Sequence, residues 1–188
     1  MKEHRILILG CSGSGKSTLT KRLAKILDLP VLHLDRIWHK TNYDDEGMRK
    51  LKQTQFDFIK GNKGFIIDGN YSSTLDLRVP HATLIIYFQL PRYITLYRVL
   101  KRTFKVRLGL EKRTDMAEKF KERVDREYLK FLKFVWKFNE TEVPIMEKAF
   151  RERDPECRIV AIKNNQDKAQ LLEDLKSKQG DNHETFVR

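Results

Sequence analysis

The sequence predicts a single α/β domain in which a parallel β-sheet is covered by helices on both faces. Short apolar runs alternate with longer segments of helical spacing along the 188 residues, and this alternation is typical of βαβ units. The apolar runs are continuous, as expected of strands that are buried on both faces. A hydrophobic share of 40% suffices for one core, whereas two cores in a chain of this length would each be small.

Three strands and two helices are expected in the first half of the chain. Arg5–Gly10 is an apolar run closed by glycine, which indicates a buried strand. Leucine and isoleucine recur at helical spacing over Lys16–Asp28, and Pro30 ends that helix. The elements that follow are a strand at Val31–Leu34, a polar stretch at Arg36–Gly47, a helix with Met48, Leu51, Phe56 and Ile59 among its apolar positions, and a strand at Phe65–Ile67.

The second half adds two more strands and four helices. Ser73-x-x-Asp76 resembles a capping box and predicts a short helix. Thr83–Phe88 is expected to be the fourth strand, and Pro91 suits the first position of the next helix. The remaining elements are a helix over Ala117–Asn139 with Phe120, Val124, Phe131, Val135 and Phe138 facing inward, a strand over Arg158–Ile162 and a helix over Lys168–Lys178. One domain therefore covers residues 1–178, and residues 179–188 are expected to form a flexible tail.

A glycine-rich loop follows the first strand and matches the pattern G-x-x-x-x-G-K-[S/T]. Its glycines let successive backbone N–H groups point into one concavity, which suits phosphate oxygens, and the next helix adds its positive end. Lys16 is expected to reach the β- and γ-phosphates, and the Ser17 hydroxyl to ligate Mg²⁺. A random chain matches this pattern roughly once in a hundred or less. The predicted nucleotide-binding residues are Gly10, Ser12, Gly13, Ser14, Gly15, Lys16, Ser17 and Thr18.

Parallel sheets bind ligands at the carboxyl ends of their strands, so the residues just after the other strands are the next candidates. Asp68 and Gly69 follow the third strand, where a carboxylate holds Mg²⁺ in enzymes with this loop; the alternative is an ordinary Asp-Gly turn. Asp35, after the second strand, is placed to accept a proton from an attacking hydroxyl or simply to cap the next segment. Trp38 is a candidate for stacking on a planar acceptor or for packing.

The positive charge of the chain is concentrated in one region. Residues 91–137 contain fifteen Lys and Arg but six Asp and Glu, which attracts polyanions such as nucleotides or nucleic acid. Arg98 and Arg102 share a helix face, where like charges repel unless an anion compensates them. We expect Arg98, Arg102 and Arg113 to neutralise charge during phosphoryl transfer, and a segment at about 103–116 to form a small lid. A solvated helix face followed by an ordinary loop is the alternative.

Several function classes are excluded or disfavoured by what the sequence contains. Asn164-Asn165-Gln166-Asp167 is not a guanine-reading motif, which argues against a GTPase, and the chain is short for a regulatory ATPase. No apolar stretch approaches the roughly 20 residues of a membrane span, so we expect a cytoplasmic protein without a membrane partner. Cys11 and Cys157 form no metal or disulfide pattern, and His33 and His39 are interpreted as structural.

Five stretches together resemble a known family. The stretches Ile8–Thr18, Pro30–Trp38, Ile66–Arg78, Pro91–Arg102 and Arg113–Ala117 are similar to adenylate-kinase-like P-loop proteins of the DNA topology modulation (FlaR-related) family. This resemblance implies a three-layer P-loop kinase fold with a five-stranded parallel sheet in the order 2-3-1-4-5 and a small arginine-bearing lid. It also places Asp68, Gly69 and Arg78 where adenylate kinases bind the acceptor. The family name also implies an effect on DNA.

The chain departs from adenylate kinases on the acceptor side. Asn70-Tyr71-Ser72 stands where they carry Phe-Pro-Arg, and Asp35 is more typical of kinases that act on hydroxyl acceptors. These departures argue against AMP as the acceptor. Arg78 is expected either to clamp an anionic acceptor or to be a surface arginine.

The sequence therefore predicts a Mg²⁺- and ATP-dependent phosphotransferase. Asp35, Trp38, Asp68, Gly69 and Arg78 face a small acceptor, Ser17 and Asp68 manage the metal, and the catalytic group comprises Lys16, Asp35, Arg98, Arg102 and Arg113. The acceptor, whether nucleoside, nucleotide or a related molecule, stays open, as does the oligomeric state. A nucleotide-switched, DNA-binding regulator of DNA topology is the alternative.

Overall fold

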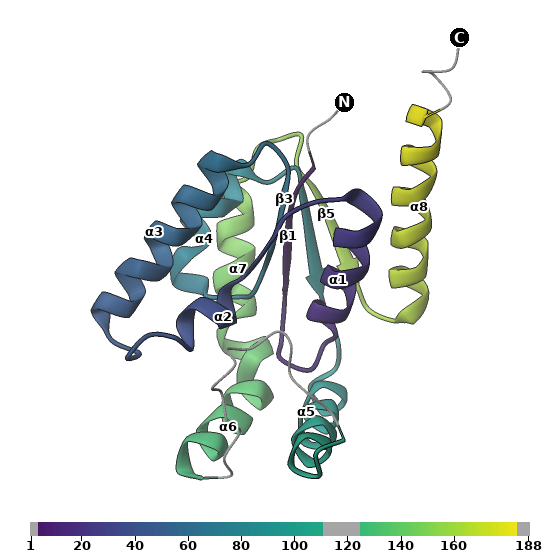
Figure 1. Cartoon of the computed structure of the whole chain (residues 1–188). Helices are drawn as coiled ribbons and strands as arrows, with labels where there is room; N and C mark the ends of the chain where they lie inside the picture. The colour runs from purple at the N-terminus through teal and green to yellow at the C-terminus, as the bar shows by residue number, and fades with distance from the viewer. Residues whose placement is uncertain (1–3, 111–124, 184–188) are drawn as a thin grey trace.

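Five parallel strands form the central sheet of the computed structural model, which describes residues 4–110 and 125–183 (Figure 1). The strands are β1 (Arg5–Gly10), β2 (Val31–His33), β3 (Phe65–Asp68), β4 (Leu84–Phe88) and β5 (Arg158–Ile162). Their spatial order is β2-β3-β1-β4-β5. The α/β class, the five strands and the order 2-3-1-4-5 are all confirmed.

Helices α1 (Lys16–Leu27) and α8 (Asn165–His183) cover one face of the sheet (Figure 1). Ile6 and Ile8 of β1 point to this face and are fully buried, because successive side chains of a strand alternate between its two faces. Leu19 and Leu23 of α1 and Leu171 of α8 complete this core. This face thus holds the helix that begins at the glycine loop.

A larger number of elements, both short and long, packs against the opposite face. They are α2 (Leu34–Trp38), α3 (Asp45–Gly61), the 3₁₀ turns η1 (Ser72–Thr74), η2 (Val79–His81) and η3 (Phe150–Glu152), α4 (Leu75–Arg78), α6 (Arg126–Thr141) and α7 (Val143–Ala149). Leu7 and Leu9 of β1 pack in this core with Leu51 of α3 and Phe138 of α6. The described chain is therefore a three-layer α/β structure.

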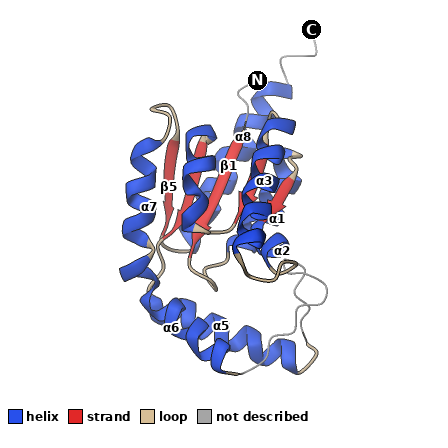
Figure 2. Ribbon diagram, turned by 90° about the vertical axis from the view of Figure 1, so that its left-hand side faces the viewer, coloured by secondary structure: helices blue, strands red, loops and turns tan. Residues whose placement is uncertain are grey.

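Helix α5 (Arg92–Arg107) lies with α6 beyond the carboxyl edge of the sheet (Figure 2). Its buried residues are Thr95, Val99 and Thr103, and the Tyr128 hydroxyl of α6 donates to Thr103 Oγ1 at 2.7 Å. Gly13 of the glycine loop lies so close to α5 that an added Cβ would stand 2.5 Å from the Thr95 carbonyl oxygen. The pair α5–α6 therefore borders the loop directly.

Some predicted elements are wrong in extent or kind. The predicted strand at Val31–Leu34 ends one residue early, at His33, because the fully buried Leu34 anchors α2. This helix extends into the expected polar stretch at Arg36–Gly47. Phe56 was predicted to lie on the apolar face of α3, but its side chain is 45% exposed, and the neighbouring Gln55 is the buried residue. The capping box at Ser73 and Asp76 does not form, since α4 begins after Thr74 without a side-chain cap. Pro91 immediately precedes α5 rather than opening it.

Other differences concern the second half of the chain. Helix α7 was not expected, and α8 extends through His183, into the segment predicted to be a tail. Residues 103–107 of the predicted lid are the end of α5, and the part at 111–116 lies outside the described residues, as do Phe120 and Val124. The lid stays a prediction. No helix in the described ranges is long and apolar enough to span a membrane.

Candidate active site

The glycine loop turns directly from β1 into α1 at the carboxyl edge of the sheet. Gly13 and Gly15 have φ values of +79° and +100°, a region that side chains with a Cβ rarely adopt. The space around the two glycines differs. A Cβ on Gly13 would collide with the Thr95 carbonyl oxygen, whereas a Cβ on Gly15 would meet nothing within 4 Å. Gly15 is also the N-cap of α1 and makes no side-chain cap, so the helix presents its N-terminal backbone amides at the loop. The local structure is that of an anion-binding nest.

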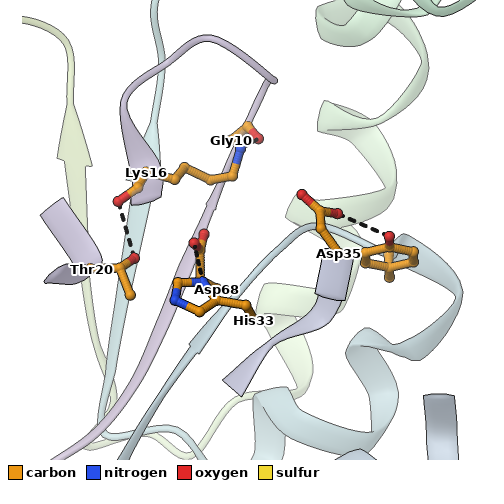
Figure 3. Close-up of polar contacts among 7 residues, drawn as sticks. Gly10, Lys16, Thr20, His33, Asp35 and Asp68 are labelled. Carbon is orange, nitrogen blue, oxygen red and sulfur yellow. Dashed lines mark hydrogen bonds and ion pairs between the residues drawn. The ribbon is translucent and has the colours of Figure 1, made fainter. Parts of the chain in front are cut away.

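The residues predicted to bind nucleotide all lie in this turn. Ser14 is almost fully buried, Ser12 and Ser17 are half-buried, and Thr18 is exposed. The Lys16 side chain folds along the loop, where its Nζ donates to the Gly10 carbonyl at 2.8 Å and to the Cys11 carbonyl at 3.0 Å (Figure 3). The ammonium group is therefore held at the start of the loop.

Cys11 is the loop residue with the least chemistry to offer. Its side chain is buried, and burial raises the pKa of the thiol above its ordinary value despite the nearby Lys16. Since the thiolate is the reactive form of cysteine, Cys11 is a small packing residue, as the sequence suggested.

Asp68 is the last residue of β3, the strand that lies next to β1 and its glycine loop. It is 5% exposed, and its Oδ2 lies 3.0 Å from Nδ1 of His33 (Figure 3). Its Oδ1 is buried and has no hydrogen-bond partner within the described residues. An unsatisfied buried carboxylate oxygen is costly, and a hard cation such as Mg²⁺ prefers oxygen ligands of this kind. The donor chemistry of Asp68 therefore fits the metal role that the sequence predicts for it, and Ser17 stands in the first turn of α1 at the end of the loop.

His33, interpreted from the sequence as structural, contacts the Asp68 carboxylate, a partner that the sequence did not reveal. The signal for it lay in the strand register: His33 and Asp68 end adjacent parallel strands and are paired Cα partners. The histidine contacts the carboxylate from the side of β2 and fixes its orientation. Within the described residues no group of three or more His, Cys, Asp and Glu gathers into a metal site.

Gly69 has a packing role in the turn after β3. Its φ is +137°, and an added Cβ would stand 2.9 Å from Leu34 Cβ. Its amide donates to the Ile8 carbonyl at 3.3 Å. Glycine is thus required here for close approach of the turn to α2.

Asp35 lies in the first turn of α2, next to the end of β2. Its Oδ1 accepts a hydrogen bond of 2.9 Å from the Tyr71 hydroxyl (Figure 3). Burial, together with the adjacent Asp35 carboxylate, raises the pKa of Tyr71 well above its ordinary range, so the phenol stays a donor. A carboxylate has further acceptor sites, and those of Asp35 remain suited to a hydroxyl proton.

Aromatic rings surround this carboxylate. Trp38 contacts Tyr71 and Tyr43 edge-on, with ring centroids 6.1 Å and 5.6 Å away. Trp38 is half-buried and packs against the core that lies beneath it. Trp38 therefore packs, as one of the two alternatives predicted, and it reaches Asp35 only through their shared neighbour Tyr71; stacking on an acceptor stays a prediction.

Arg78 is neither a surface arginine nor positioned to touch an acceptor in this conformation. Its side chain is 0% exposed. Nη2 donates to the Asn70 carbonyl, and Nη1 to Gln55 Oε1 at 3.4 Å. Burial lowers the pKa of the guanidinium to about 9, while Tyr71, Asp68 and Asp76 oppose that shift. Arg78 remains charged at neutral pH and supports the turn after β3 from beneath.

The three arginines predicted to neutralise charge are placed differently. Arg98 is exposed, and its Nη1 donates to the Ser14 carbonyl at 3.3 Å, so it borders the loop. Arg102 is half-buried one turn later on α5. Arg113 lies outside the described residues. Lys168 of α8 is a further cation in the neighbourhood of Arg98: burial lowers its pKa, and the positive charges of Arg22 and Arg98 lower it further.

Comparisons with known proteins establish the fold. The chain matches no protein-family model and no curated protein. Among solved structures it is similar to a shikimate kinase from Bacteroides thetaiotaomicron, with a TM-score of 0.56, 15% identity and coverage of 94% of this chain and 98% of that one. It is also similar to a gluconokinase from Sinorhizobium meliloti, with a TM-score of 0.52, 14% identity and coverage of 100% and 99%.

A third similar structure is a shikimate kinase from Acinetobacter baumannii solved with shikimate, with a TM-score of 0.51, 16% identity and coverage of 99% and 96%. The similarity extends over nearly the whole chain in each case, at identities that identify the fold alone. The chain therefore has the fold of small-molecule P-loop kinases.

Proposed function

We propose that the protein is a Mg²⁺- and ATP-dependent phosphotransferase that moves the γ-phosphoryl group to a hydroxyl of a small acceptor. One observation carries this proposal. The loop after β1, Asp68 at the end of β3 and Asp35 after β2 follow three strands that are neighbours in the sheet. Adjacent strands are about 4.8 Å apart, so the donor loop, the metal carboxylate and the acceptor-side carboxylate stand in line along one edge.

Each residue in this line has a defined task. The loop amides and Lys16 bind the phosphates, with Arg98 beside Ser14 adding positive charge where charge develops during transfer. Asp68 and Ser17 hold Mg²⁺, which supplies further charge neutralisation at the phosphates when it is bound. Asp35 takes the proton of the acceptor hydroxyl as its oxygen bonds to the γ-phosphorus, and the bond from that phosphorus to the bridging oxygen breaks to release ADP.

The acceptor side favours a hydroxyl-bearing molecule. Asp35, Tyr71 and Trp38 offer a carboxylate, a hydroxyl and an aromatic edge. Arg78, the residue expected to clamp an anion, is buried and bonded within the protein. The names of the similar structures, shikimate kinase and gluconokinase, agree with a hydroxyl acceptor.

An acceptor screen tests the proposal. Purified protein, Mg·ATP and a panel of nucleosides, nucleotides, sugars and polyols are assayed for acceptor-dependent release of ADP. Asp35→Asn should lower the rate with the best acceptor by about 100-fold or more and leave nucleotide affinity near wild type, whereas Lys16→Ala should weaken both. Lys25→Ala, at an exposed position late in α1, is the matched control. ADP release that no acceptor increases would instead indicate an NTPase.

Nucleotide-dependent binding of DNA is the second candidate function, favoured by the composition of α5. This helix carries six Lys and Arg and no Asp or Glu, and Lys101, Lys105 and Arg107 are exposed. Release of counterions makes such binding steeply salt-dependent. Tight binding of duplex DNA that weakens steeply with salt, in a protein that transfers phosphate to no acceptor of the panel, would favour this function over the kinase.

A further inference from the structure

Asn70 makes a two-point contact with the first residue of the glycine loop. The Gly10 amide donates to Asn70 Oδ1 at 2.8 Å, and Asn70 Nδ2 donates to the Gly10 carbonyl at 2.8 Å. The two residues are sixty positions apart in sequence. Because both edges of the side-chain amide are matched to a complementary backbone group, only one orientation of the amide satisfies the pair. This contact joins the turn after β3 to the turn after β1.

Asn70 is itself held from below by buried polar groups. Its carbonyl accepts a hydrogen bond from Nη2 of Arg78, which is charged at neutral pH, and bonds from ionised donors are stronger than neutral ones. Gln55 accepts from Arg78 at 3.4 Å and from the Thr74 hydroxyl at 3.2 Å. All three of these supporting side chains are buried. These buried contacts hold the backbone of Asn70 in place, independently of the contact between its side chain and the loop.

The groups on either side of Asn70 belong to opposite halves of the proposed reaction. The Gly10 carbonyl that accepts from Asn70 also accepts from Lys16 Nζ. Tyr71, the next residue, donates to Asp35. One side-chain amide thus connects the phosphate-binding lysine to the turn that carries the acceptor-side hydrogen bond.

We propose that Asn70 is a positioning residue that holds the phosphate loop in register with the metal- and acceptor-side turn. It touches neither phosphate nor acceptor and acts through Gly10. Without it the Gly10 amide loses its side-chain partner, and the Gly10 carbonyl keeps Lys16 Nζ but loses Asn70. The loop and Lys16 then lose the contact that aligns them with the turn after Asp68. This inference rests on the proposed function for its consequence in catalysis, whereas its structural content is testable alone.

The experiment compares Asn70→Ala with Asn70→Asp. Alanine removes the acceptor for the Gly10 amide and leaves the Gly10 carbonyl with Lys16 Nζ alone. Aspartate keeps the size and the acceptor for the Gly10 amide, but it turns a carboxylate oxygen toward the Gly10 carbonyl. Affinity for Mg²⁺ with β,γ-imido-ATP is expected to fall about tenfold in Asn70→Ala and further in Asn70→Asp. A residue that merely fills space would give the reverse order, with aspartate near wild type.

Asn62→Ala is the matched control. Asn62 also makes a 2.8 Å bond from its side chain to a backbone carbonyl, that of Phe58, but it follows α3 before β3 begins. Its loss should lower the melting temperature by a similar amount without changing nucleotide affinity. Hydrogen exchange of the Gly10 amide, measured by NMR in all variants, should accelerate in Asn70→Ala and stay slow in Asn62→Ala.

The outcomes separate this inference from the function on which it builds. If the wild type fails to bind the Mg²⁺–nucleotide probe, the proposed function is wrong, and Gly10 exchange still tests the role of Asn70. If the wild type binds and Asn70→Ala binds equally with an equally protected Gly10 amide, the inference is wrong and the kinase proposal stands. Once an acceptor is known, Asn70→Ala should lower kcat more than it raises the acceptor KM, as misalignment of bound reactants does.

Discussion

Gly13 and Gly15 share a left-handed backbone but differ in what surrounds them. A Cβ on Gly13 would stand 2.5 Å from the Thr95 carbonyl and 3.0 Å from Val99, whereas nothing lies within 4 Å of the same atom on Gly15. The glycine at position 13 is therefore required by both backbone and packing, and that at position 15 by backbone alone.

Substitution of the two glycines should separate these requirements. Gly15→Ala pays backbone strain of about 1–3 kcal/mol, and Gly13→Ala adds displacement of α5, so Gly13→Ala should have the lower melting temperature by several degrees. Thermal unfolding followed by circular dichroism measures the difference. Equal melting temperatures of Gly13→Ala and Gly15→Ala would show that α5 moves away from the added methyl group at no measurable cost in stability.

Asp68 offers a second test at the scale of one residue. Asp68→Asn removes the negative charge while it keeps the size and a contact for His33. The Mg²⁺ concentration that gives half-maximal binding of β,γ-imido-ATP should rise about tenfold or more, because the uncharged amide is a poorer magnesium ligand. Asp57→Asn on the exposed face of α3 should leave it unchanged. An unchanged requirement in Asp68→Asn would remove Asp68 from the metal site.

The helix pair α5–α6 shows how two elements secure one side of the site. The Tyr128 hydroxyl reaches Thr103, whose own hydroxyl donates to the Val99 carbonyl at 3.1 Å. On the outer side Arg92 pairs with Glu140 at 2.8 Å and lies over the Trp136 ring. Exposed ion pairs contribute little to stability, so the buried contact between Tyr128 and Thr103 is the one that matters.

Tyr128→Phe tests this contact with minimal change in volume. Loss of one buried hydrogen bond costs about 1 kcal/mol, which lowers the melting temperature of a domain of this size by about 2–4 °C. Tyr97→Phe is the control, because Tyr97 is 62% exposed on α5. Similar melting temperatures for the two variants would mean that the buried bond contributes nothing.

Element by element, the strands were predictable and some helices were not. The central strands β1, β3 and β4 are apolar runs buried on both faces, which explains why the sequence reveals them. The edge strands β2 and β5 are partly exposed, but each still contains a short apolar run. Helix α2 escaped prediction because only Leu34 anchors its five residues, and α7 because its seven residues contain Pro144 and only Met146 is buried. Short helices depend on tertiary packing, which periodicity alone does not convey.

Some residues of the candidate site were likewise predictable from the sequence, and others were not. The loop residues could be predicted as candidates because they form one contiguous motif. Asp35 and Asp68 could be predicted because each follows a strand, and the carboxyl ends of parallel strands lie at one edge of the sheet. The contacts of His33 and Asn70 could not be predicted, because their partners Asp68 and Gly10 are distant in the chain. Arg78 was misjudged in exposure, since arginine is rarely fully buried.

For the whole molecule, bound nucleotide should appear as added stability. At one hundred times its Kd a ligand that binds only the folded chain adds about 2.7 kcal/mol, which corresponds to about 5–10 °C in melting temperature. We expect this increase with Mg·β,γ-imido-ATP in the wild type and not in Lys16→Ala. A wild-type melting temperature that does not respond would contradict nucleotide binding itself.

The placement of Trp38 also allows ligand binding to be followed by intrinsic tryptophan fluorescence. The chain has two tryptophans: Trp38 lies beside Asp35 and Tyr71, and Trp136 lies on α6 beneath the Arg92 guanidinium. A Trp136→Phe variant leaves indole emission from the acceptor side alone, and Trp38→Phe leaves it from the helix pair near the loop. Titrations of the two variants with nucleotide and with candidate acceptors therefore show, without a label, which ligand changes the emission on each side of the candidate site.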